Sequence, residues 1–167
     1  MALQGSGIIT FTHLKVRKKM NRESVYEQLK IDEGVVYELY NDHLGYATFG
    51  VGHLVKESDP EYGSSLGTPI SEERVRECFE SDLNTAISEC NTLYGEGAFT
   101  NYPATVQEVL VNMMFNMGRP RLSKFKNFSS ALEEQDWKRA AVEGRDSVWY
   151  RQVTNRAERL MSRLEQV

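Results

Sequence analysis

The sequence predicts an α+β protein with two lobes, a small lobe made of one helix and a β-hairpin and a larger lobe made of helices. Three observations support this fold class. After residue 20, strand-like segments flanked by turn residues are confined to residues 35–51, a long amphipathic stripe follows Ser71, and the chain after residue 101 has helical apolar spacing. No internal repeat or low-complexity tract interrupts this order.

The small lobe is expected to span about residues 21–70. Asn21 is a suitable N-cap for a helix over residues 22–33, and Gly34 is suited to end that helix. Residues 35–40 and 46–51 have strand character, and the turn-forming sequence NDHLG joins them. The expected order is therefore helix and then hairpin.

A long helix is expected over about residues 71–90. Ser71 can cap it, and Glu72 and Glu73 lie in its first turn, where the helix dipole favours acids. Its apolar residues recur with a nearly ideal helical period, and they are Val75, Cys78, Phe79, Leu83, Ala86, Ile87 and Cys90. Such a helix would join the small lobe to a helical lobe over about residues 91–167.

The helical lobe is expected to contain several shorter helices. Their ranges are about residues 106–117, 126–134, 137–143 and 155–164. Gly118 and Gly144 are suited to end the first and the third, and Asp136 and Asn155 to cap the third and the fourth. Residues 91–101, with two glycines, are expected to connect the long helix to this lobe.

Composition restricts the classes of function. The formal net charge of −4 argues against a nucleic-acid partner and against long-range attraction to an anionic cell wall. No apolar run approaches the roughly 18 residues that span a membrane, so no membrane insertion is expected. Cys78 and Cys90 would lie about 18 Å apart on one helix, too far for a disulfide, and both are expected to be reduced core thiols. We expect a monomer.

Residues 1–20 are set apart as an N-terminal extension to a functional domain over residues 21–167. Ile9 and Phe11 alternate with polar neighbours, which fits a short strand, whereas GSG at residues 5–7 resembles a linker. A vector-derived segment and an extension from an alternative start fit equally well. The apolar piece precedes the basic cluster of residues 15–22, the reverse of the order in a signal peptide. A solvated tail is the simplest expectation for that cluster.

Most motifs of enzyme chemistry are missing from the sequence. It contains no Walker loop, no GxGxxG after a strand, no HExxH and no GxSxG. His13, His43 and His53 do not form a close ligand set, so neither a metal nor a cofactor is expected. Both cysteines lie on a core-facing stripe, which argues against covalent cysteine catalysis.

Two acidic residues are the strongest candidates for chemistry. Glu33 lies at the C-terminal end of a helix, where the dipole favours the protonated acid, and Asp42 lies in a polar turn, where solvent favours the carboxylate. Glycoside hydrolysis requires one group of each kind. Thr48 on the returning strand is placed to help hold a water molecule. Many hairpins follow a helix that ends in Glu, so the spacing alone is a weak signal.

Three motifs then resemble a known family in the same order. IDEG at residues 31–34, followed by YNDHLGYATFGVGHL at residues 40–54, resembles the active-site helix and hairpin of the T-even phage lysozymes, glycoside hydrolase family 24. NMMFNMG at residues 112–118 and WYRQVTNRA at residues 149–157 continue the similarity, which covers about residues 22–165. The resemblance implies a lysozyme-like two-lobed fold and a muramidase without cofactor. Such an enzyme hydrolyses the β-1,4 bond between N-acetylmuramic acid and N-acetylglucosamine in bacterial peptidoglycan.

The resemblance also implies roles for the site residues. Glu33 matches the general acid, and Asp42 and Thr48 match the pair that positions or activates the attacking water. The family inverts the anomeric configuration, which implies carboxyl groups about 6.5–9.5 Å apart. Leu54 and Phe115 match residues that line the sugar cleft, and Phe115 fits the core equally well.

Three further residues are expected to support the site. Asp82 interrupts the apolar stripe of the long helix, where a charge needs a partner. His53 matches the family's histidine that pairs with this aspartate, and the pair would tether the small lobe to the long helix. Arg156 matches an arginine that orients the catalytic acid, and its alternative is an exposed arginine at a helix end.

Several positions depart from the family. Asn116 stands where a glutamine is familiar, and Phe128 and Glu143 replace small polar residues that contact sugar. The net charge of −4 replaces the basic charge typical of phage endolysins. These departures leave the catalytic residues unchanged and bear on substrate affinity and host range.

The expected biology is lysis of an infected host. Without a signal peptide, the protein would be made in the host cytoplasm and would reach the wall in the periplasm after a separate protein permeabilises the membrane. One alternative is a lysozyme domain carried on a phage tail and used at entry, which RDSVWY at residues 145–150 favours. Another is an inactive peptidoglycan-binding module, which the intact Glu33, Asp42 and Thr48 disfavour.

Overall fold

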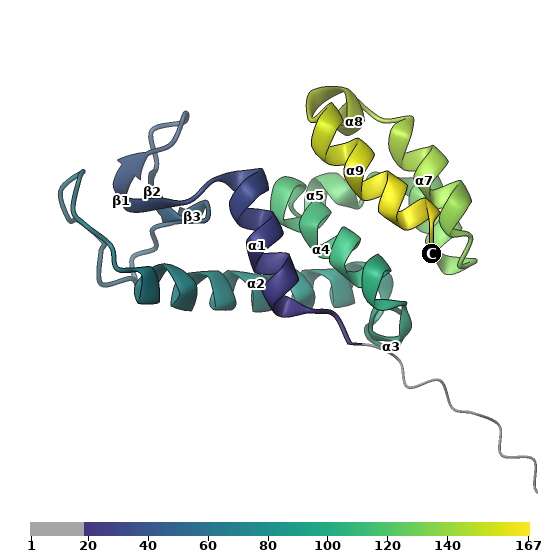
Figure 1. Cartoon of the computed structure of the whole chain (residues 1–167), viewed down its shortest axis with the longest axis horizontal. Coiled ribbons are helices and arrows are strands. Elements are labelled where there is room, and N and C mark those ends of the chain that lie inside the picture. The colour runs from purple at the N-terminus through teal and green to yellow at the C-terminus, as the bar shows by residue number, and fades with distance from the viewer. Residues whose placement is uncertain (1–18) are drawn as a thin grey trace, which may run out of the picture.

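A small sheet forms one end of the molecule. The structure is a computed structural model in which residues 19–167 are described. Helix α1 (Arg22–Glu33) leads into an antiparallel sheet of β1 (Val36–Asn41), β2 (Ala47–Gly50) and β3 (His53–Leu54), which lie in that spatial order. The sheet and its loops occupy one end in Figure 1.

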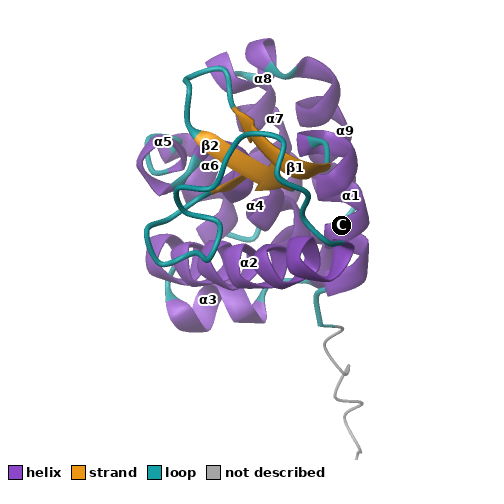
Figure 2. Ribbon diagram, turned by 90° about the vertical axis from the view of Figure 1, so that its left-hand side faces the viewer, coloured by secondary structure: helices purple, strands orange, loops and turns teal. Residues whose placement is uncertain are grey.

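Helix α2 (Glu72–Tyr94) runs from the sheet end to the helical end along one side of the molecule (Figure 1). The remaining elements are all helical: α3 (Glu96–Asn101), α4 (Ala104–Met117), α5 (Arg119–Leu122), α6 (Lys126–Glu133), α7 (Trp137–Arg145), α8 (Val148–Gln152) and α9 (Thr154–Glu165). Figure 2, turned to look from the sheet end, shows the strands in front of this group of helices. The predicted α+β class is confirmed.

Capping side chains fix the beginnings of the main helices as predicted. Asn21 accepts a hydrogen bond from the backbone N–H of Ser24 at the start of α1, and Ser71 accepts one from Arg74 at the start of α2. Asp136 does the same for α7 through Arg139 N–H. Each bond satisfies a backbone donor that the first turn of a helix leaves unpaired. Gly34, with φ of 76°, ends α1 at the predicted position.

The core lies between α2 and the helices around α4. The predicted apolar stripe of α2 is buried apart from Ile87, which is partly buried. Helix α4 is buried on almost every side, because α2 and α9 both pack against it. Cys78 and Cys90 are free buried thiols, as expected.

The helical end contains features that the sequence did not predict. Short helices α3, α5 and α8 lie in segments expected to connect longer ones, and β3 adds a third strand to the expected hairpin. Asn155 does not cap α9, which begins at Thr154 after Val153. Gly144 does not end α7 either, because the helix continues to Arg145. A Cβ on Gly144 would collide with Met161 on α9, so this glycine serves close helix packing.

The expectations for residues 5–16, a linker and a strand, lie outside the described residues. The solvated tail predicted for residues 15–22 is wrong for Arg22. Its guanidinium forms an ion pair with Glu80 at 2.7 Å and donates to Asn84 Oδ1, which ties α1 to α2. No helix within residues 19–167 is both long enough and apolar enough to cross a membrane.

Candidate active site

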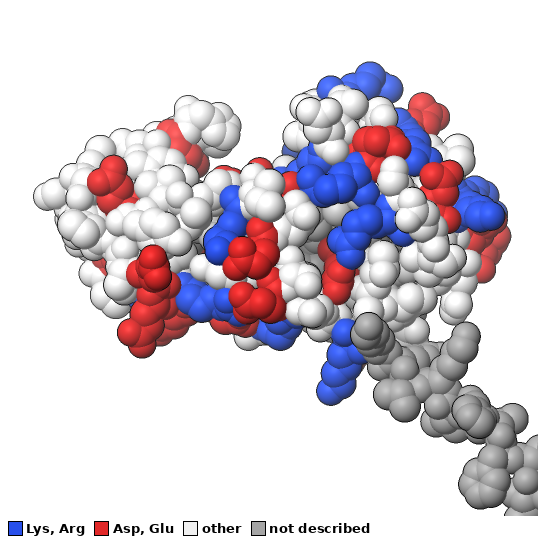
Figure 3. All heavy atoms as spheres, in the orientation of Figure 1, with Lys and Arg blue, Asp and Glu red and all other residues white. Residues whose placement is uncertain are grey.

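The molecule is hollowed between its sheet end and the α8–α9 end, as the space-filling view shows (Figure 3). Helix α1 ends at this hollow and the chain turns there into β1 (Figure 1). The C-terminal turn of α1 carries Glu33, whose side chain is 24% exposed. The hollow is therefore lined from one side by the first predicted acid.

Arg156 on α9 holds the carboxylate of Glu33. Its Nη1 donates to Glu33 Oε1 at 2.8 Å, and the arginine itself is 9% exposed. The other oxygen, Oε2, lies near Gly52, since a Cβ on that glycine would be 4.0 Å from it. The predicted contact between Arg156 and Glu33 is present, and the alternative of an exposed arginine is excluded.

Asp32 and Asn112 hold Arg156 in turn. Arg156 Nε donates to Asn112 Oδ1 at 2.9 Å, and the amide of Asn112 donates to Asp32 Oδ2 at 2.8 Å. Arg159 Nη2 lies 2.6 Å from both oxygens of Asp32, whose side chain is 3% exposed. The cluster thus pairs two acids with two guanidinium groups, which allows these charges to be buried together.

Asp42 is fixed by the hairpin turn. Its Oδ1 accepts hydrogen bonds from the backbone N–H groups of Leu44 and Tyr46, both at 2.9 Å. This is the local bonding that favours Asp in turns. Among the hydrogen bonds of residues 19–167, Oδ2 accepts none, so one carboxylate oxygen is fixed while the other remains for a ligand or water.

Thr48, like Asp42, is held by the backbone of Tyr46. Its hydroxyl donates to the carbonyl of Tyr46 at 2.9 Å, and the residue is 2% exposed. The N–H of Tyr46 holds Asp42 and its C=O holds Thr48. The oxygen of Thr48 therefore keeps its lone pairs for accepting a hydrogen bond.

Tyr40 lies near both acids. It is the direct cross-strand partner of Thr48. Burial raises the pKa of Tyr40, and the negative charges of Asp42 and Glu33 raise it further. Both carboxylates therefore contribute to the electrostatic environment of one phenol.

His53 forms the predicted contact with Asp82 and a second one that was not predicted. Its Nδ1 lies 2.7 Å from Asp82 Oδ2 and its Nε2 lies 2.8 Å from Asp59 Oδ2. Burial lowers the pKa of His53, but the hydrogen bonds to Asp82 and Asp59 outweigh it and leave the pKa above its ordinary value. The imidazole joins β3 to α2 and to the loop after β3.

Leu54 and Phe115 share one cavity of about 560 Å³, together with His53 and Asp82. Leu54 is exposed at 51%, which suits a residue that touches a ligand. Phe115 is partly buried and packs on Phe79, with ring centroids 5.8 Å apart. Its ring therefore packs in the core and also forms part of the cavity wall.

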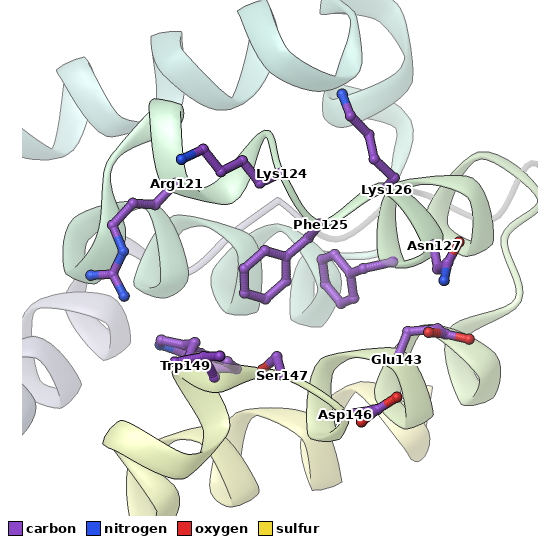
Figure 4. Close-up of a pocket in the computed structure, with 11 residues that line it drawn as sticks. Arg121, Lys124, Phe125, Lys126, Asn127, Glu143, Asp146, Ser147 and Trp149 are labelled. Atoms are coloured by element: carbon purple, nitrogen blue, oxygen red, sulfur yellow. The ribbon is translucent and has the colours of Figure 1, made fainter.

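A second cavity of about 450 Å³ lies between α5–α6 and α7–α8. Figure 4 shows Lys124 and Lys126 along one edge and Glu143 and Asp146 along the opposite edge. Trp149 lies in its wall and donates from Nε1 to Asn116 Oδ1 at 2.7 Å. Asn116 follows Phe115 on α4, so this hydrogen bond links the wall of the second cavity to the helix that carries Phe115.

Sequence reasoning missed Asp32, Asn112, Arg159, Asp59 and Tyr40. Asp32 and Asn112 stand inside the motifs that carried the resemblance, and their polar side chains beside apolar helix positions were the available signal. Asp59 lies in a polar loop with many candidate partners, and only the fold brings it to His53.

Two acids in different surroundings are what glycoside hydrolysis requires, and the fold and the family match place the chain in the class of glycoside hydrolases. Residues 30–166 match the phage lysozyme family. The chain therefore belongs to that family, as the motifs predicted.

Several known proteins are similar to the chain in sequence. A probable T4-type lysozyme 2 of Dictyostelium discoideum is 31% identical over 159 residues, which cover 85% of this chain and 94% of that protein. The pre-baseplate central spike protein Gp5 of Enterobacteria phage T4 is 29% identical, with 82% of this chain covering 27% of that protein. The peptidoglycan hydrolase gp36 of Pseudomonas phage phiKMV is 28% identical, with 76% of this chain covering 13% of that protein.

Proposed function

We propose that the protein hydrolyses the β-1,4 bond between N-acetylmuramic acid and N-acetylglucosamine in bacterial peptidoglycan, with inversion at the anomeric carbon. Membership of the phage lysozyme family supports the substrate class, and one relative is named a peptidoglycan hydrolase. The observations that support the mechanism are the hydrogen bond from Arg156 to Glu33 and the hydrogen bonds by which the backbone of Tyr46 holds Asp42 and Thr48.

Glu33 is the general acid in this proposal. Its proton passes to the glycosidic oxygen as the bond to the anomeric carbon breaks. Arg156 fixes Oε1, so Oε2 is the oxygen available to carry the proton. Asp32, which also pairs with Arg159, lies 3.7 Å from Arg156 and offsets part of its positive charge.

Asp42 and Thr48 act on the attacking water. Asp42 Oδ2 and Thr48 Oγ1 accept hydrogen bonds from it, and the water oxygen attacks the anomeric carbon from the face opposite the leaving group. The proton released by the water passes to Asp42. This division of labour requires the carboxyl separation of about 6.5–9.5 Å that is typical of inverting enzymes.

Two cavities with different linings support a substrate that bears groups of different character. Leu54 and Phe115 offer apolar surface to sugar rings in one cavity, and the other cavity carries basic and acidic side chains on opposite edges (Figure 4). A polymer that bears both charged and apolar groups would use both cavities. Peptidoglycan has this character.

Release of sugar reducing ends from purified Gram-negative peptidoglycan tests the proposal. Glu33→Gln is expected to lower the rate by about 10²–10⁴-fold, because general acid catalysis contributes this much. The fold should survive, since the amide oxygen can still accept from Arg156. Asp42→Asn should also lose activity while its Oδ1 keeps the hydrogen bonds of the turn.

Glu38→Gln is the matched control, because Glu38 is an exposed carboxylate on the neighbouring strand β1. It should retain wild-type activity. If Glu33→Gln released reducing ends at the wild-type rate, the assignment of Glu33 as the general acid would be wrong. Wall binding by a folded wild-type protein that releases no reducing ends would instead support a binding module.

Lysis of the infected host is the setting we propose first, with production in the host cytoplasm and action in the periplasm. A tail-associated role is the second candidate, because a spike protein of a phage baseplate is among the relatives. The length of the reading frame in the source genome distinguishes the host-lysis role from the tail-associated role. A frame that continues into tail-like sequence supports the second setting and contradicts the first.

A further inference from the structure

The loop after β3 brings three potential metal ligands together beneath the sheet. One ring nitrogen of His53, a carboxylate oxygen of Asp59 and Cys78 Sγ all lie within 4.8 Å of one another. They come from three separate segments: β3, the loop that follows it, and α2. His53 and Cys78 are buried, and the Asp59 side chain is 14% exposed.

We propose that His53, Asp59 and Cys78 form a binding site for Zn²⁺ or a similar divalent transition-metal ion. Imidazole nitrogen, carboxylate oxygen and thiolate sulfur are the donors that zinc uses in proteins. Tetrahedral coordination needs donor atoms about 3.3–3.7 Å apart, which follows from metal–ligand bonds of about 2.0–2.3 Å. The 2.8 Å contact between His53 Nε2 and Asp59 Oδ2 would open slightly to admit the ion.

Asp82 supplies the outer contact that such a site requires. A histidine that binds a metal through one nitrogen usually donates the other N–H to a carboxylate or carbonyl. Asp82 Oδ2 lies 2.7 Å from His53 Nδ1. It therefore directs Nε2 toward Asp59, and this nitrogen offers a lone pair to a metal once the metal has displaced its proton.

The charge balance of the cluster permits a divalent ion. A carboxylate only accepts hydrogen bonds, so both ring nitrogens of His53 carry protons when both aspartates are ionised. A bound Zn²⁺ would displace one proton from Nε2 and one from the thiol of Cys78. The net charge then stays unchanged, and Arg74, which lies 3.4 Å from Asp59 and also pairs with Glu61, meets no added positive charge.

The metal would connect β3 and the loop that follows it to α2. Burial raises the pKa of the Cys78 thiol to about 11, so the unbound thiol is protonated and inert. Coordination removes that proton, because a metal-bound thiol is deprotonated. Binding should therefore strengthen with pH and stabilise the sheet end of the molecule.

Thermal unfolding with ZnCl₂ and with a chelator is the first test. The wild-type melting temperature should rise by about 5–10 °C at a Zn²⁺ concentration about 100 times Kd. Cys90→Ser is the matched control, because Cys90 is an equally buried thiol on the same helix. It should keep the response, whereas Cys78→Ser should lose it.

Two further measurements keep the proposal testable if Cys78→Ser does not fold. Co²⁺ added to the wild-type protein should give a thiolate-to-metal charge-transfer band, and Cys90→Ser should give the same band. Asp82→Asn should weaken Zn²⁺ binding by about 10–100-fold, as outer contacts to a ligating histidine do. A wild-type protein with no Zn²⁺ response and no cobalt–thiolate band would overturn the proposal, and so would a Cys78→Ser protein that responds like the wild type.

Discussion

At the scale of single residues, the backbone of Tyr46 positions two predicted site residues, and no side-chain motif in the sequence indicates this. Its N–H fixes Asp42 and its C=O fixes Thr48. The types of both site residues were predictable because carboxylates and hydroxyls stand out in a hairpin sequence. Their common anchor was not, because every residue has the same backbone groups and only the turn geometry decides which ones meet a side chain.

Glu158 gives a residue-scale prediction about pH. The hydrogen bond from Arg145 is the largest cause that lowers the pKa of Glu158 from 4.5 to about 2, and bonds from Ser162 and Tyr150 add to it. A lowered pKa means that the native state favours the carboxylate. The stabilisation is therefore complete above about pH 4.5 and is lost as the pH falls toward 2.

Glu158→Gln should accordingly lower the melting temperature at pH 6 and have little effect near pH 2. Thermal unfolding followed by circular dichroism measures both. Glu57→Gln, in an exposed loop, should change neither value. An equal loss at the two pH values for Glu158→Gln would show that the carboxylate charge is not the source of stability.

At the scale of elements, amphipathic period and capping residues predicted α1, α2, α4 and α7 well. Short elements were harder, since α5, α8 and β3 span too few residues for a period to show. Gly144 misled the prediction for a physical reason. A glycine near the end of a helical pattern looks like a terminator, but here the missing side chain makes room for Met161 of α9.

Gly144→Ala should therefore destabilise the protein by about 1–3 kcal/mol, the cost of overpacking a buried contact. Gly97→Ala is the control, because a Cβ there meets open space within α3. It should be neutral or stabilising by up to about 1 kcal/mol, since alanine is the better helix former. Urea unfolding of both variants measures the difference.

The cost of Gly144→Ala should also be measured in a protein that carries Met161→Ala. Shortening Met161 removes the atoms that the new methyl group would meet, so Gly144→Ala should cost less in that background than alone. An unchanged cost would mean that Gly144 matters for its backbone and not for its contact with α9.

At the scale of the whole molecule, charge is distributed unevenly. Lys and Arg side chains gather over the α7–α9 end, and the sheet end shows mostly uncharged and acidic groups (Figure 3). The net charge is −4. Long-range attraction depends on the net charge, while contact in the hollow depends on the nearby basic groups.

Activity on intact anionic walls should rise when salt increases from 10 mM to 100 mM, in contrast to a strongly basic lysozyme. The screening length shrinks from about 30 Å to about 10 Å over this range, which weakens repulsion between two negative bodies. Short uncharged glycan fragments should be hydrolysed at a rate that salt hardly changes. Turbidity of wall suspensions and release of reducing ends give the two rates, and a fall with salt on intact walls would show that the basic end governs the encounter.

The contact between Glu33 and Arg156 joins residues 123 positions apart in the chain. During synthesis the acid emerges early from the ribosome, but its arginine arrives only when α9 is made. A chain interrupted before residue 156 would carry Glu33, Asp42 and Thr48 without Arg156, the group that we propose orients the acid. Under the proposed mechanism, hydrolytic activity is therefore expected only after α9 has been synthesised and has packed against α1.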